Sequence, residues 1–513
     1  MRRRIHRSVF LLLLSALAVA MTTSVFLMNL VWVLLLVNWI AEWNWKEKFS
    51  DFSSNYLLHA VLVLFAVHFV WVFVGHNWPM GFDDVRRKLP LLAIPLVLLT
   101  SPALSVRERR PVVAFYLATV LVVSLIGLVR FLSMPDLPYR EIVPYISHIR
   151  FGLNVCLAIV ILLMAAFRLK RLGRWLCLAA VVWLVAFLML IQSYTSFVII
   201  AALFLVGMVV LWKRFSPVSR KVVLTVGVAA VVAVVGTTVV LVHDYYSLSP
   251  LASQPLVSCT ANGNPYRHGR DGFVENGSYV NDYVCEQELR SEWPDYSQVG
   301  LDELTPLGYT VYPALVRYLN AKGVTKDSVG LSSLTETDVR AIEQGVANPV
   351  YLRQGSPRKM VYTLLFEYEN FRHYDNVRNF SMLQRFELWN NAVVTFLSHP
   401  LLGVGTGDVV DATQQTMLQR QSPLYGYEKY PHNQYLSFLL SFGLVGLSLI
   451  SFFFVRALRK TASSDSFVYV AFWTVFLVSC LSEDTLQTMA GIAFFTFFYS
   501  LFSRPSPQEV RDF

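Results

Sequence analysis

The chain has 513 residues, of which 55% are hydrophobic and only 15% are charged, and its formal net charge is +9. Several apolar runs reach the roughly 20 residues that cross a bilayer, which excludes a soluble globular protein. In a polytopic membrane protein a basic excess reports which helix ends face the cytoplasm, so we expect no nucleic-acid partner.

The first residues form a basic head, an apolar run and a stretch of small residues, which would also fit a signal peptide. A second apolar run follows at once and many more come later, so we interpret the segment as a first transmembrane helix. The fold class predicted is an all-α polytopic membrane protein with about twelve transmembrane helices. The predicted spans are 9–23, 25–41, 57–75, 89–105, 112–133, 151–168, 174–191, 194–212, 221–242, 434–455, 465–482 and 487–503.

One large hydrophilic segment interrupts the series of helices. We divide the chain into transmembrane helices 1–9 (1–242), a loop domain (243–433), and helices 10–12 with a cytoplasmic tail (434–513). Helical periodicity and capping signals in the loop domain predict mainly helices. The stretches concerned are "YPALVRYLNAKG", "LTETDVRAIEQG", "RKMVYTLLFEYENF" and "QRFELWNNAVVTFLSHP".

An N-terminus inside the cell places nearly every dense basic cluster in the cytoplasm. The loop domain then faces outward, into the periplasm if the cell is Gram-negative, and both termini are cytoplasmic. There, Cys259 and Cys285 are expected to form a disulfide, since both lie in this polar segment. The stretch "DDVRRK", residues 83–88, disagrees with the rule. Either a span is miscounted, or these cations stay outside to meet an anionic ligand or lipid headgroups.

The predicted topology gathers candidate side chains at the outer ends of the helices. His148 and Arg150 precede the sixth span, Arg385 lies on the last loop helix, and His432 directly precedes the tenth span. Each also has a simpler interpretation. A histidine can cap an interfacial helix, an arginine can snorkel towards headgroups, and a helix arginine can be a solvated surface residue.

Two further stretches lie at the same predicted depth. Glu483 and Asp484 stand at the outer end of the eleventh span, where acids more often have a partner than not. A run containing Gly405 could be only a turn, and it lacks the lysine of a nucleotide-binding loop. Gly443 and Gly446 are expected to allow close helix packing. We see no metal-ligand spacing, so we expect no metal and no cofactor.

These motifs resemble the O-antigen ligase and polymerase superfamily of bacterial membrane glycosyltransferases, over nearly the whole chain. "SHIRF" precedes the sixth span, and the run from Arg385 to Gly407 reads "R…W…A…HP..G.G". "HNQYLSFLLSFGLVG" is the most specific element. The loop domain is also similar to a Bacteroidetes branch of the family.

The resemblance implies a metal-independent inverting enzyme that takes a glycan from undecaprenyl pyrophosphate. The acceptor is lipid A-core for a ligase or another glycan for a polymerase, and membrane lipids surround the protein. Many relatives carry a Ser-Arg pair near the start of the eighth span, whereas this chain has Tyr194, Thr195 and Ser196 there. Arg150, or Arg86 and its neighbour, would then replace the missing cation.

The resulting hypothesis assigns a role to each of the candidate residues. His432 is the base for the acceptor hydroxyl, Glu483 or Asp484 holds its ring, and arginines bind the pyrophosphate. The pyrophosphate residues are Arg385, Arg150 and Arg86; the supporting residues are Asn433, Asp484, Gly405 and His148.

Three alternatives stay open at this point. An O-antigen or exopolysaccharide polymerase shares the same donor motifs, and a protein O-glycan ligase would use them too. A lipid-linked glycan transporter fits less well, because its helices should carry charged residues deep in the membrane, whereas these spans are nearly free of charge.

Overall fold

The computed structural model describes residues 2–504 except 51, 135–136, 213–215, 271–273, 354, 375–376, 378–379 and 462–466. The tail predicted to be cytoplasmic extends over 505–513, outside the described residues. The all-α class is confirmed: within the described residues the only sheet is the short antiparallel pair β1 (Val274–Glu275) and β2 (Ser278–Tyr279).

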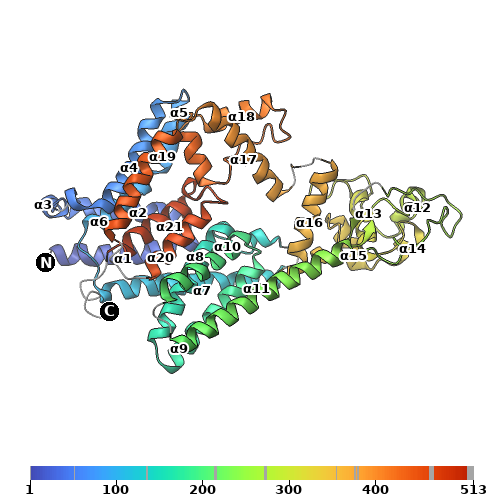
Figure 1. The fold of residues 1–513 in the computed structure, drawn as a ribbon, viewed down its shortest axis with the longest axis horizontal. Coiled ribbons are helices and arrows are strands. Elements are labelled where there is room, and N and C mark those ends of the chain that lie inside the picture. Colours follow the sequence, from blue (N-terminus) through green and yellow to red (C-terminus); the bar gives the residue numbers. More distant parts are fainter. Residues whose placement is uncertain are drawn as a thin grey trace. The chain divides into compact units, whose positions relative to one another are not determined.

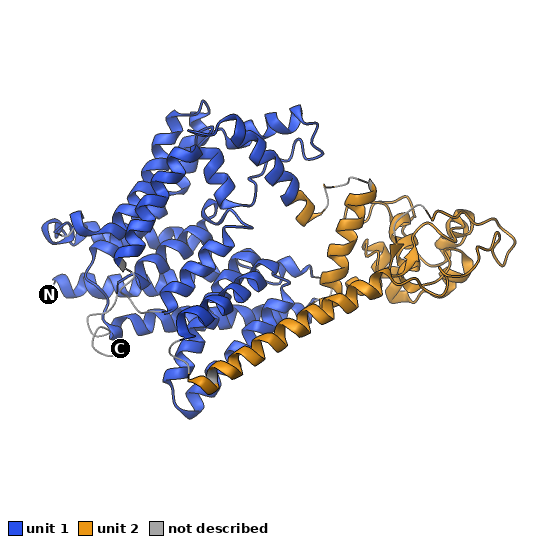
Figure 2. Ribbon diagram, viewed as in Figure 1, with its two compact units in different colours: residues 1–215, 385–513 blue, residues 216–384 orange. Residues whose placement is uncertain are grey.

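The chain divides into two compact units, shown in different colours in Figure 2. Unit 1 comprises 1–215 and 385–513, and unit 2 comprises 216–384. The helices of the first part of unit 1 are α1 (Arg2–Thr23), α2 (Val25–Ala41), α3 (Trp45–Lys48), α4 (Tyr56–Val70), α5 (Trp78–Arg87), α6 (Leu89–Thr100), α7 (Val106–Ser133), α8 (His148–Arg168), α9 (Arg171–Leu190) and α10 (Tyr194–Leu211). Those of its second part are most of α17 (Ser381–Ser398), α18 (Val409–Gln419), α19 (Gln434–Thr461), α20 (Phe467–Ser479) and α21 (Met489–Phe502).

The described residues contain eight helices that are long and apolar enough to cross a membrane, or nine if α2 and the segment after it form one span. Four of the twelve predicted spans are shorter helices. These are α2, α6, α20 and α21, with 17, 12, 13 and 14 residues. Helix α6 ends just before Pro102, and the mostly polar segment between α20 and α21 is not helical at 480–484.

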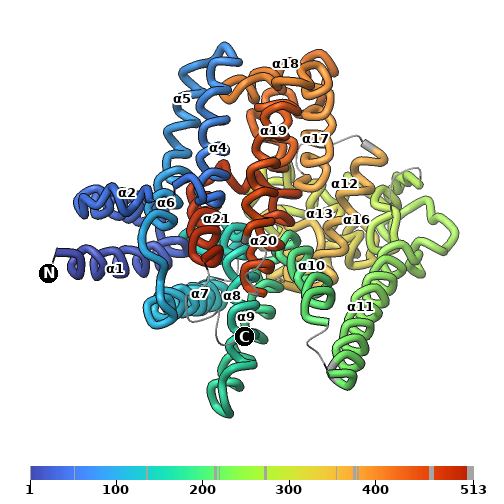
Figure 3. Tube along the Cα trace, turned by 60° about the vertical axis from the view of Figure 1, so that its left-hand side comes forward, coloured from blue at the N-terminus to red at the C-terminus, as the bar shows by residue number. Residues whose placement is uncertain are grey.

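The core of unit 1 forms around α20 and α21. Helix α21 packs along α6, and α20 lies against α8 and α10 (Figure 3). Aromatic rings fill this contact: Phe476 and Phe495 have ring centroids 4.4 Å apart, and Phe495 stacks on Tyr499 at 5.4 Å. The loop that joins α20 to α21 is therefore carried by two helices of this aromatic core.

Helix α19 runs beside α4 (Figure 1) and is broken at Gly443, whose φ of 59° and ψ of −164° are not helical. The stretch 400–405 fills the break. Val404 N–H donates to the Leu440 carbonyl at 2.8 Å, and Val445 N–H donates to the Leu401 carbonyl at 3.0 Å. Gly443 is thus more than the packing position that we predicted. It opens the helix so that another segment can satisfy the freed backbone groups, as a membrane interior requires.

Unit 2 contains α11 (Pro217–Tyr246), α12 (Glu286–Glu292), α13 (Val311–Lys322), α14 (Ser328–Ser332), α15 (Glu336–Glu343) and α16 (Pro357–Tyr374). The four helices predicted in the loop domain are confirmed, with α17 as the fourth. Helix α13 ends at Gly323 in the left-handed region, and α15 begins with a capping box between Thr335 and Asp338.

The disulfide predicted in the same region is not formed. Both Cys259 and Cys285 are free thiols. Cys259 is exposed beside Pro265, with which it forms an isolated bridge, whereas Cys285 is buried and its N–H donates to the Lys326 carbonyl. One thiol faces solvent and the other faces the core, so the two sulfur atoms do not meet.

Candidate active site

The candidate site is built on the loop between α20 and α21. Its backbone is held by the residues that start α19: Gln434 accepts from Leu486 N–H at 2.7 Å through Oε1, and its own N–H donates to the Cys480 carbonyl. Asn433 donates from Nδ2 to the Leu481 carbonyl at 3.0 Å. The polar residues in front of the tenth predicted span therefore fix the loop that carries both candidate acids.

Glu483 is the centre of the site. Its side chain is buried, and its Oε1 accepts from Arg385 Nη2 at 2.6 Å. Its Oε2 lies 3.5 Å from Arg150 Nη2 and 4.0 Å from His432 Nδ1. Three residues that are distant in the sequence and were predicted to act together thus converge on one carboxylate.

Arg150 is the most deeply held cation of this group, with a side chain only 8% exposed. Its Nε donates to Thr488 Oγ1 at 3.1 Å and its Nη2 donates to the Asp484 carbonyl at 3.1 Å. Its Nη1 is buried without a hydrogen-bond partner among the described residues. A buried guanidinium N–H left in this state can donate to an incoming anionic oxygen without first giving up another partner.

His432 sits in a left-handed backbone conformation with φ of 52°, which is uncommon for a residue other than glycine. Its N–H donates to Asp484 Oδ2 at 2.7 Å, which fixes this conformation. Burial lowers the pKa of His432, and Glu483 opposes this effect only in part. The imidazole is therefore neutral at pH 7, which is the state that a general base needs.

Asp484 is the second acid of the loop and holds the first turn of α19. Besides the His432 N–H it accepts from Ser437 Oγ, which lies on the same helix face as Asn433. Burial raises the pKa of Asp484 to about 6, with a smaller contribution from Glu483, although both hydrogen bonds act in the opposite direction.

Replacing Asp484 by asparagine should change how stability depends on pH. Because its pKa is raised in the folded state, ionisation of Asp484 lowers the free energy of unfolding as the pH rises from the ordinary 3.8 to about 6. The loss amounts to about 3 kcal/mol. We expect the thermal midpoint of the wild type in detergent to fall relative to that of Asp484→Asn across this interval. Asp302→Asn, at a carboxylate 79% exposed, is the control. A wild-type-to-variant difference that stays constant with pH would contradict the assignment.

Three predicted site residues lie outside this cluster. Gly405, with φ of 93°, packs its backbone against Gly75 and so fastens the stretch after α17 to the end of α4. Arg86 is exposed and pairs with Asp83 at 2.6 Å. His148 begins α8 and packs edge-on against Tyr139, within electrostatic range of Arg385. Of the candidates to replace the missing cation, Arg150 lies in the cluster, whereas Arg86 pairs with Asp83 at the surface.

Residues 83–88, the basic stretch that disagrees with the positive-inside rule, contact the loop of the candidate site. Lys88 is fully buried: its Nζ donates to Asp84 at 2.6 Å and to Gln487 Oε1 at 2.8 Å, in the loop that carries Glu483. This lysine therefore holds the loop through its hydrogen bond to Gln487 and is not exposed to headgroups. No sequence signal separated it from its exposed neighbours Arg86 and Arg87.

The start of α10, where relatives carry an arginine, also touches the loop. Thr195 Oγ1 lies 3.0 Å from Ser482 Oγ, and Ser196 packs so closely against Gly152 of α8 that a Cβ there would collide with its hydroxyl. Ser437 and Thr488 were not predicted, and Thr195 was noted only as part of a stretch that lacks an arginine. Their only signal is that each stands at or near the start of an apolar helix.

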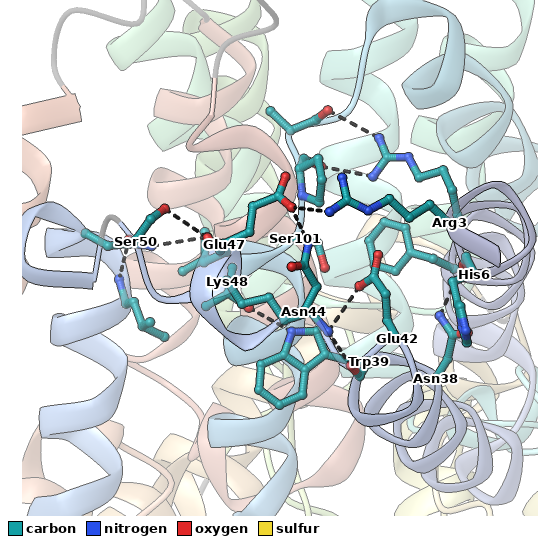
Figure 4. Close-up of a pocket in the computed structure, with 18 of the residues that line it drawn as sticks. Arg3, His6, Asn38, Trp39, Glu42, Asn44, Glu47, Lys48, Ser50 and Ser101 are labelled. Atoms are coloured by element: carbon teal, nitrogen blue, oxygen red, sulfur yellow. Dashed lines mark hydrogen bonds and ion pairs between the residues drawn. The ribbon is translucent and has the colours of Figure 1, made fainter. Parts of the chain in front are cut away.

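A cavity of about 580 Å³ lies elsewhere in unit 1. It is lined by Trp39, Glu42 and Lys48, among others (Figure 4). Arg504, just after the end of α21, also lines it, whereas Glu483 stands before the start of that helix. Among the described residues no group of three or more His, Cys, Asp or Glu side chains is placed to hold a metal ion.

In a comparison with known protein families, one region of the chain matches a family model, and it contains two of the clustered residues. Residues 345–451 match the family model described as O-antigen ligase, a range that includes Arg385, His432 and the break at Gly443. No curated protein matches the chain. With its many apolar helices, this is a membrane protein of ligase or polymerase type that handles a lipid-linked glycan and an acceptor. By this match, the chain contains an O-antigen ligase domain at residues 345–451.

Proposed function

We propose that the protein is an O-antigen ligase that transfers a glycan from undecaprenyl pyrophosphate to a sugar hydroxyl of lipid A-core. The reaction would take place at the periplasmic face of the bacterial inner membrane, with both termini in the cytoplasm. The observation that carries the proposal is the convergence of Arg150, Arg385 and His432 on Glu483.

The two arginines would bind the pyrophosphate of the donor. They come from α8 and α17 and flank one carboxylate, so they already form a site for an anion with several oxygens. The planar fork of arginine suits phosphate oxygens, and its charge stabilises the leaving group as the bond to the sugar breaks. In this scheme Arg150 supplies the cation that relatives carry on the eighth span.

His432 would take the proton of the acceptor hydroxyl. The hydroxyl oxygen attacks the anomeric carbon from the side opposite to the pyrophosphate, so the carbon is inverted as the carbon–oxygen bond to phosphate breaks. The proton passes to the neutral ring of His432, whose lowered pKa keeps it unprotonated at neutral pH. No metal is required, because arginines balance the charge of the leaving group.

A strain that lacks the gene separates the ligase from the polymerase reading, since both would use this donor site. For a ligase we expect long polymer to accumulate on the carrier lipid and lipid A-core to lose its O-antigen. Single repeats attached to core would show a polymerase instead, and unchanged surface glycan and carrier lipid would contradict both readings. A strain complemented with the wild-type gene is the control.

A further inference from the structure

The arginine pair that would bind the donor is occupied by a group of the protein itself. Glu483 Oε1 holds Arg385 at 2.6 Å, and its Oε2 lies 3.5 Å from Arg150. A donor pyrophosphate cannot share these cations with a buried carboxylate, because like charges repel strongly where water is excluded. Donor binding therefore requires the carboxylate to leave.

The structure offers one near destination for that carboxylate. Glu483 Oε2 is 4.0 Å from His432 Nδ1, just beyond hydrogen-bond distance. The backbone around it is fixed, since Arg150 Nη2 binds the Asp484 carbonyl and the Asp484 carboxylate binds His432 N–H. With the backbone held in this way, the carboxylate would reach the ring by a movement of its own side chain.

We infer that Glu483 is an internal placeholder for the donor pyrophosphate, and that donor binding transfers its carboxylate from the arginines to the ring of His432. The buried Arg150 Nη1 has no hydrogen-bond partner among the described residues, so Glu483 does not use it. A bound pyrophosphate could form an additional hydrogen bond with this nitrogen. A carboxylate on Nδ1 orients the ring and stabilises its protonated form. The base thus becomes stronger only when a donor is present. This inference rests on the proposed function.

The test uses the full chain in nanodiscs, with farnesyl pyrophosphate as a sugar-free probe and NMR of ¹⁵N-labelled histidine as the readout. His432→Gln identifies the His432 signal. In the wild type we expect the probe to raise the pKa of His432 by about one unit. In Glu483→Gln we expect no such rise, and we expect the probe to bind about tenfold more tightly because its competitor has lost its charge.

Two variants guard against a merely structural effect. Glu483→Asp keeps the charge on a shorter side chain, so we expect probe affinity near that of the wild type but a smaller rise of the His432 pKa. Glu47→Gln removes a carboxylate that pairs with Arg3 at 3.1 Å near the cavity, and we expect it to behave as the wild type. Thermal midpoints of all variants show whether they are folded.

The outcomes distinguish this inference from the proposed function. If Arg385→Gln and Arg150→Gln bind the probe as tightly as the wild type, the donor site itself is wrong. If these variants weaken binding, but Glu483→Gln neither tightens it nor abolishes the pKa rise, the donor site stands and the placeholder is overturned. A His432 pKa that does not rise on probe binding in the wild type also overturns it.

Discussion

Replacing His432 by alanine is expected to slow glycan transfer about 10²–10⁴-fold, the range that one general base contributes. The physical reason is that a sugar hydroxyl is a poor nucleophile, and that among the described residues His432 is the histidine that lies beside Glu483, at 4.0 Å. Binding of the donor should persist, because the arginines remain. The measurement is the initial rate with purified protein and both lipid substrates, together with probe affinity.

The backbone of His432 calls for a second variant. Its φ of 52° disfavours alanine, whereas asparagine tolerates the left-handed region. We therefore expect His432→Asn to lose transfer while keeping the wild-type thermal midpoint. His59→Ala is the control, since His59 packs between Phe52 and Tyr56 near the start of α4, away from the site. Transfer at the wild-type rate by His432→Asn would contradict the role as base.

Replacing Gly443 by alanine is expected to lower the free energy of unfolding by about 2–6 kcal/mol, from backbone strain and overpacking together. A Cβ at this position would lie 2.3 Å from the Leu401 carbonyl oxygen and 2.6 Å from Gly403 N, both rigid backbone atoms. The 400–405 stretch must then leave the break in α19. The thermal midpoint in detergent measures the loss.

Gly236→Ala is the matched control for this substitution. Gly236 lies within the long apolar helix α11 and has no atom within 4 Å of an added Cβ. We expect its midpoint to equal or exceed that of the wild type, because alanine favours helix. Equal midpoints for the Gly443 and Gly236 variants would show that the break in α19 is not required for the fold.

The sequence predicted that several distant residues lie at the same depth, and it did so from their positions relative to the predicted helices. Arg150 and His432 were placed at the outer ends of predicted spans and Arg385 on the last loop helix, and the structure brings all three to one carboxylate. Topology alone could do this because helices of a bundle align their ends. Glu483 was assigned to His432, whereas its closest contact is with Arg385, since side-chain direction does not follow from helix order.

Other features depend on long-range packing that no local pattern encodes. Lys88 and Arg86 belong to one basic run, yet one is buried against Gln487 and the other is exposed. The break in α19 at Gly443 depends on residues 400–405, about forty residues earlier, which bind the freed backbone groups. The disulfide prediction followed from compartment and composition, which cannot show that Cys259 and Cys285 face opposite ways.

The short length of α21 bears on how far below the membrane surface glycan transfer would occur. Its 14 residues rise about 20 Å, whereas the hydrocarbon of a bilayer is about 30 Å thick. Its C-terminal end lies beside the basic residues Arg109 and Arg504. If these residues face the cytoplasm, as the charge pattern predicts, the other end of the helix would stop short of the opposite surface. The loop with Glu483 would then sit in a recess within the bilayer's own thickness. A polyprenyl carrier can reach such a recess by sideways diffusion, with its phosphates drawn below the headgroup plane. Hydrophobic mismatch would therefore make transfer sensitive to lipid chain length.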